Sequence, residues 1–101
     1  MTDRSMLPGN LWRAREVAMM HRNALVDIAR NAVPVRIVVA DDGSVLNIWS
    51  DSVNETRQRC QRVMHNWRIV LSVLETHGSD DDLSRALDGL FAAAVPTGGA
   101  R

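Results

Sequence analysis

The sequence predicts an α+β fold with three helices and one β-hairpin in the order α-β-β-α-α, the hairpin packed on the helices. Three observations predict it: apolar residues at helical spacing before Pro34, a run dense in Val, Ile and Leu around Asp42-Gly43, and two further helical patterns after Ser52. The chain has 101 residues, the length of one domain. We therefore expect a single domain over 8–94, with flexible ends at 1–7 and 95–101.

The first predicted helix begins with Asn10 as its N-cap and ends at about Asn31, because Pro34 disfavours helical geometry in the residue before it. An apolar stripe follows it: Leu11, Ala14, Ala18, Leu25, Ile28 and Ala32. Further apolar residues widen this stripe: Val17, Met19, Met20, Ala24 and Val26. A helix that is apolar over so much of its circumference needs cover on more than one side.

The hairpin is predicted from Val35 to Ser50, with Asp42-Gly43 supplying the positive φ angles of a tight turn. With a loop of two or four residues, three pairs face each other across the strands: Val39 with Leu46, Ile37 with Ile48, and Arg36 with Trp49. The first two pairs would form a core face. The third would place a guanidinium over an indole ring on the opposite face.

The second predicted helix begins at a capping box formed by Ser52 and Glu55 and ends at Gly78 as its left-handed cap. Its apolar residues alternate steps of three and four, as in a heptad seam: Val53, Thr56, Cys60, Val63, Trp67, Val70, Leu74 and His77.

The last predicted helix is capped by Ser79, and three aspartates, 80–82, favour the positive end of its dipole. Its buried stripe is predicted as Leu83, Leu87, Leu90, Phe91 and Ala94. This helix should therefore pack back on the others.

No pattern in the sequence indicates catalysis. The single cysteine, Cys60, falls on the apolar seam, where a thiol is usually an inert small hydrophobe. The three histidines, His21, His65 and His77, match no metal-ligand spacing, and no Gly-rich phosphate loop is present. We expect a protein that is not an enzyme, with no cofactor and no metal.

The apolar pattern favours association with a protein partner. An isolated two-stranded hairpin is barely stable in water and exposes two unpaired edges, and the chain offers no third strand. We therefore interpret the chain as a non-catalytic interaction protein: a homodimer, or a regulatory or accessory subunit of a larger complex. The residues expected to carry the buried contacts are Val17, Met20, Ala24, Val63, Trp67, Val70 and Leu74. In the alternative interpretation, the helices cover all this surface within a monomer, because heptad-like spacing also occurs in intramolecular bundles.

Nucleic-acid binding is a second alternative. The helix over 53–77 carries four arginines that would contact phosphates, Arg57, Arg59, Arg62 and Arg68. Against it, Asp51 and Glu55 would repel phosphate at the start of this helix. The whole chain balances 12 basic against 12 acidic residues, which argues against strong nonspecific attraction to nucleic acids or membranes.

A third alternative is a small-ligand sensor. The succession of a helix, an Asp-Gly hairpin and a helix resembles the opening of sensory α/β modules such as the roadblock and PAS groups, whose remaining strands are missing here. In such a module, Trp12, Trp49 and Trp67 would line a pocket, although large aromatic residues also serve as core packing. With no leader pattern and no long apolar run, we expect a soluble, cytoplasmic protein.

Overall fold

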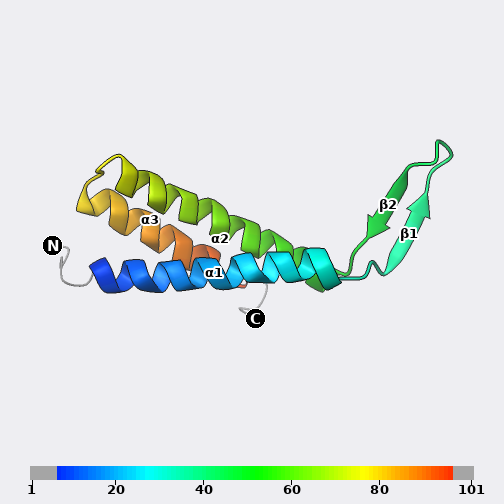
Figure 1. The fold of residues 1–101 in the computed structure, drawn as a ribbon, viewed down its shortest axis with the longest axis horizontal. Coiled ribbons are helices and arrows are strands. Elements are labelled where there is room, and N and C mark those ends of the chain that lie inside the picture. The colour runs from blue at the N-terminus through cyan, green and yellow to red at the C-terminus, as the bar shows by residue number, and fades with distance from the viewer. Residues whose placement is uncertain (1–6, 97–101) are drawn as a thin grey trace.

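A computed structural model describes residues 7–96 as three helices and one antiparallel hairpin (Figure 1). The elements are α1 (Leu7–Asn31), β1 (Arg36–Val39), β2 (Val45–Ile48), α2 (Asp51–Glu75) and α3 (Asp80–Ala93). The predicted class and the α-β-β-α-α order are confirmed. Most of the ends that the sequence predicts to be flexible, 1–6 and 97–101, lie outside the described residues.

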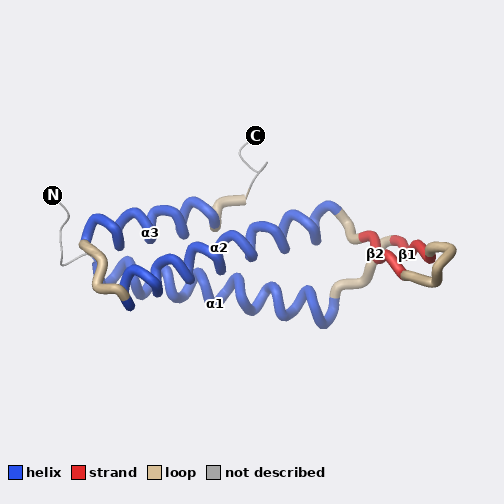
Figure 2. Tube along the Cα trace, turned by 90° about the horizontal axis from the view of Figure 1, so that it is seen from above, coloured by secondary structure: helices blue, strands red, loops and turns tan. Residues whose placement is uncertain are grey.

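The molecule is elongated, with the hairpin projecting from one end of the helices (Figures 1 and 2). Its extents are 59 × 33 × 19 Å and its radius of gyration is 17.5 Å, against about 13 Å for a compact chain of this length. The helices differ in length: α1 and α2 have 25 residues each and α3 has 14. Because a helix rises about 1.5 Å per residue, α3 covers only part of the other two, which continue as a two-helix stem to the hairpin.

The core lies where all three helices overlap. Its fully buried residues are Ala14 and Ala18 on α1, Cys60, Val63 and Val70 on α2, and Leu87 and Leu90 on α3, with Ala86 almost as buried. The two alanines of α1 lie one turn apart, and their small side chains let the neighbouring helices approach closely. The predicted stripe of α3 is confirmed, since Leu83, Phe91 and Ala94 pack against this cluster.

The helix starts differ from the sequence predictions for α1 and α2. The hydroxyl of Ser50, not that of Ser52, caps α2 by accepting the N–H of Val53 at 3.1 Å. Ser50 lies two residues after the end of β2, so it offers the same cap two residues earlier than Ser52 and lengthens the helix. Helix α1 begins three residues before Asn10, because Pro8 is tolerated in a first turn, where its missing N–H has no intrahelical partner. The Ser79 cap of α3 is confirmed.

The turn between α2 and α3 also corrects a prediction. The left-handed residue is His77, with φ of 54°, and not Gly78. The N–H of Gly78 donates to the Val73 carbonyl at 2.8 Å and the N–H of His77 to the Leu74 carbonyl at 3.3 Å, which together make a Schellman motif. Gly78 is needed for space, since a Cβ there would lie 2.7 Å from Cγ1 of Val73.

We expect substitutions at this turn to act in opposite directions. His77→Gly should raise the free energy of unfolding by about 1 kcal/mol, because a left-handed conformation is costly for any residue with a Cβ. Gly78→Ala should lower it by about 1–2 kcal/mol, because the new methyl group overlaps Val73. Urea titrations of the two variants would measure both changes in the free energy of unfolding. A stabilising effect of Gly78→Ala would contradict the assignment of the left-handed residue.

The strand register differs by one residue from the predicted one. Val38 faces Leu46, Val39 faces Val45, and Arg36 faces Ile48. The loop has three residues, 41–43, closed by the N–H of Gly43 donating to the Ala40 carbonyl at 2.9 Å, and Gly43 has φ of +85°. A three-residue loop with a left-handed glycine is the second common hairpin connection. A slip of one residue moves every side chain of one strand to the other face.

The hairpin contacts the helices only at its base. All eight strand residues are exposed, so the predicted core face on the hairpin is wrong. At the base, the Asn54 amide of α2 donates to the Trp49 carbonyl at 3.4 Å. The guanidinium above the Trp49 ring is that of Arg57, at 5.1 Å, and not that of Arg36. Arg57 lies in the second turn of α2, so the helix holds the arm where it leaves the bundle.

Candidate functional site

The projecting hairpin, residues 35–48, which we call the arm, is an exposed apolar surface. Its large aliphatic residues are between 36 and 67% exposed: Val35, Ile37, Val38, Val39, Val45, Leu46 and Ile48. The register places Ile37, Val39 and Val45 on one face and Val38, Leu46 and Ile48 on the other. An antiparallel sheet usually keeps one face polar. Here both faces are apolar, which is unfavourable in water unless another surface covers them.

The edges and the tip of the arm add two further features. The described sheet consists of β1 and β2 alone, so the outer edge of each strand is unpaired. The tip carries Asp41 and Asp42. The Asp42 carboxylate accepts hydrogen bonds from the hydroxyl and N–H of Ser44 at 2.7 and 2.9 Å, and these bonds lower the pKa of Asp42. The tip is therefore negatively charged at neutral pH.

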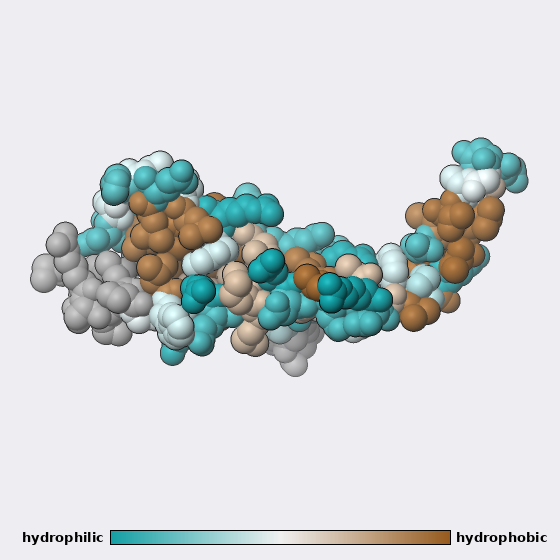
Figure 3. Space-filling view, in the orientation of Figure 1, coloured by the Kyte–Doolittle hydropathy of each residue, from teal (hydrophilic) through white to brown (hydrophobic). Residues whose placement is uncertain are grey.

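A second apolar surface lies between α1 and α2, at the end of the bundle away from the arm. It is a groove of about 410 Å³, which we call the α1–α2 groove, lined by Leu11, Trp12, Arg15, Trp67, Leu71 and Leu74. Arg15 is its one charged lining residue, with its guanidinium 5.7 Å from the Trp12 ring centre. Figure 3 shows apolar surface gathered on this end of the molecule and on the arm, with mostly polar surface between them.

The predicted interface residues separate into three groups. Val63 and Val70 have no exposed surface and belong to the core of this chain. Trp67 and Leu74 line the α1–α2 groove. The three residues of α1 differ among themselves: Val17 packs against the core, Ala24 is half-buried and Met20 is exposed.

Sequence reasoning places only part of the α1 side of the groove. The sensor hypothesis groups Trp12, Trp49 and Trp67, and the structure brings Trp12 and Trp67 together in the groove, whereas Trp49 lies at the base of the arm. Leu11, predicted in the core stripe, also lines the groove. Spacing within one helix cannot reveal which residues of another helix lie opposite it. The available signal was Trp12 itself, since a tryptophan next to a predicted core stripe indicates that apolar surface extends beyond the core.

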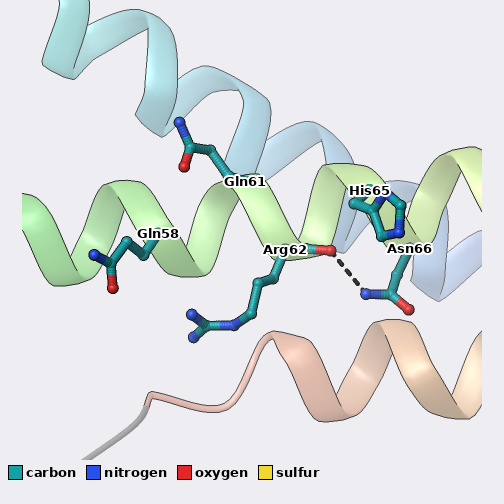
Figure 4. Close-up of a pocket in the computed structure, with 5 residues that line it drawn as sticks. All are labelled: Gln58, Gln61, Arg62, His65 and Asn66. Atoms are coloured by element: carbon teal, nitrogen blue, oxygen red, sulfur yellow. Dashed lines mark hydrogen bonds between the residues drawn. The ribbon is translucent and has the colours of Figure 1, made fainter.

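The four arginines of the nucleic-acid hypothesis do not form one exposed row. Arg57 is engaged at the base of the arm, Arg59 and Arg62 are half-buried, and Arg68 is exposed. A polar groove on the outer side of α2 is lined by Gln58, Gln61, Arg62, His65 and Asn66. Figure 4 shows Gln61 directed toward α1 and Arg62 directed toward α3, with the Asn66 amide donating to the Arg62 carbonyl at 2.8 Å. Arg62 is the one arginine that lines this groove, and nucleic-acid binding stays a prediction.

The cysteine and the histidines occupy structural or isolated positions. Cys60 is 1% exposed, and burial raises the pKa of its thiol, so it is a neutral packing group. Nδ1 of His21 lies 2.7 Å from the Val17 carbonyl oxygen, and because a carbonyl only accepts, Nδ1 carries the proton. Within residues 7–96, no three or more His, Cys, Asp or Glu side chains are grouped to hold a metal ion.

Comparisons with known proteins add no relative. No protein-family model, no curated protein and no solved structure matches the chain. None of the described helices combines the length and the apolar composition needed to cross a membrane.

Proposed function

We propose that this protein works by association, as a non-catalytic homodimeric subunit with a regulatory or accessory role, and that the arm is its main contact element. One observation carries the proposal: a two-stranded hairpin, apolar on both faces, projects from the helices and is uncovered by its own chain. An isolated two-stranded hairpin is only marginally stable in water. A partner that covers it removes apolar surface from water and gives its edges hydrogen-bonding groups.

The free energy gained by burying the arm is of the size expected for a reversible complex. Fully burying a Val, Leu or Ile side chain contributes about 1.5–3 kcal/mol, so covering one half-exposed side chain contributes about 1 kcal/mol. The arm offers seven such side chains. Association costs about 4–15 kcal/mol in lost freedom of motion. The arm of one copy therefore yields little net affinity alone, whereas the two arms of a symmetric dimer contribute about 14 kcal/mol against a single cost of association.

A second copy of the chain is an acceptable partner on electrostatic grounds. The chain carries 12 basic and 12 acidic residues, so two copies do not repel each other through net charge. Each copy also contributes both an arm and exposed apolar helix surface. Most soluble oligomers are symmetric homo-oligomers, with two-fold dimers the commonest class.

The test is the mass of the protein in solution. We expect static light scattering at tens of micromolar to give twice the chain mass, falling toward one chain mass on dilution. Val39→Thr with Val45→Thr should weaken the dimer at least tenfold, because it places two hydroxyl groups at one cross-strand pair while keeping β-branched side chains. Asn47→Ser, on the same face, is the matched control and should leave the dimer intact. A wild-type protein that stays monomeric at every concentration would contradict homodimerisation.

A further inference from the structure

Resting on the proposed function, we infer how the two copies meet: they lie side by side and antiparallel, and the arm of each copy occupies the α1–α2 groove of the other. The arm and the groove are apolar surfaces on the part of the chain that the structure describes, and neither is covered within the chain. The proposed occupant of each groove is thus the arm of a second copy.

The positions of the two surfaces support this pairing. The arm leaves one end of the elongated bundle and the groove lies near the other end (Figures 1 and 3). In the view of Figure 1 the arm bends toward the side of the bundle on which α2 lies, and in Figure 3 the apolar surface at the far end faces the viewer. A half-turn of a second copy places its groove end beside the first copy's arm, and the reverse contact forms at once by symmetry.

The chemistry of the two surfaces is complementary. The strands of the arm present Val, Ile and Leu, and the groove presents leucine and tryptophan side chains. The tip of the arm carries Asp41 and Asp42, while the one charged residue lining the groove is Arg15. An apolar arm with a negative tip therefore meets an apolar groove with a positive side chain, and this charge pair gives the contact a defined direction.

The exposed side chains suit a specific dimer. On one face of the arm, Ile37, Val39 and Val45 are 59–65% exposed, and in the groove Trp12 is 59% exposed. A standard interface buries about 800 Å² per partner, of which roughly 57% is apolar. Because each copy contributes both an arm and a groove, both surfaces add to the apolar area buried per partner.

Reciprocal exchange also closes the assembly. A contact between two different surfaces forms an open filament unless a symmetry operation returns it to the first copy. An antiparallel pair does so after two copies, because both arms and both grooves are then occupied. We therefore expect a dimer and no larger species.

A charge-reversal experiment tests the arm-to-groove contact. Asp41→Arg and Arg15→Asp each create like charges at both contacts of the homodimer, and each should weaken it by about tenfold. An equimolar mixture of the two variants should recover wild-type affinity, because every arm tip then meets a groove of opposite charge. Asp41 is chosen because the Asp42 carboxylate holds the turn. Arg13→Asp, exposed on α1 outside the groove lining, is the control and should leave affinity unchanged.

The outcomes separate this inference from the proposed function. A dimer that is weakened by Val39→Thr with Val45→Thr but is indifferent to Arg15→Asp would overturn arm exchange and leave homodimerisation standing. A monomeric wild type would overturn both. A mass that grows beyond two chains with concentration would overturn the closed two-fold arrangement. Recovery of the mixed variants to a mass of two chains supports the exchange, since a contact confined to the helices would not respond to Asp41.

Discussion

Replacing Leu90 by alanine is expected to lower the free energy of unfolding by about 3–4 kcal/mol. Leu90 has no exposed surface and is the largest fully buried side chain. It lies in the cluster that joins α3 to Val63 and Val70 of α2 and to Ala14 of α1. Domains of this size have total stabilities of about 5–15 kcal/mol. Removal of one side chain should therefore bring the helical part close to unfolding.

Urea unfolding followed by far-ultraviolet circular dichroism would measure this change, compared at equal protein concentration so that self-association does not differ. Val95→Ala is the matched control, because Val95 is exposed just after α3 and should change the free energy by less than about 0.5 kcal/mol. A loss below about 1 kcal/mol for Leu90→Ala would mean that α3 does not pack on the other helices as described.

Excision of the arm is expected to abolish self-association while leaving the helices folded. The chain ends at the base of the arm are adjacent, since the N–H of Val35 donates to the Ile48 carbonyl at 2.8 Å. A short glycine linker can therefore replace residues 36–47. No strand residue belongs to the core, so the free energy of unfolding of the isolated helical part should change by less than about 1 kcal/mol.

Two measurements test the expected effect of removing the arm. Circular dichroism should show the same cooperative loss of helix as in the intact chain at concentrations where that chain is monomeric. Light scattering should give the mass of one chain even at high concentration. Helices that unfold after the excision would contradict the view that the arm is an appendage of the bundle. A dimer that persists without the arm would move the contact to the helical surface.

Local signals account for the elements that the sequence predicted correctly. Ser79 followed by three aspartates defines the start of α3 through side-chain hydrogen bonding and the helix dipole. Pro34 limits α1 because of a clash with the residue before it. These effects act within a few residues of the chain and need no tertiary context.

The sequence predictions were wrong where two local conformations of the chain have similar energy. Asp42-Gly43 suits a two-residue loop and also the last two positions of a three-residue loop, and the choice between them shifts the strand register by one. Ser50 and Ser52 are both competent caps, and the earlier one starts α2. His77 and Gly78 can both end a helix, and the close approach of Val73 leaves the left-handed position to His77.

The sequence by itself determined the three helices, the hairpin, their order and the excess of apolar side chains. Only the tertiary structure decided where that excess lies. The short α3 covers one end of the longer helices, so Val63 and Val70 are hidden while the arm stays uncovered. The groove joins Trp12 with Trp67, 55 positions apart in the chain. The spacing of apolar residues within one helix cannot predict this contact, because the contact depends on how two helices cross and which of their faces come together.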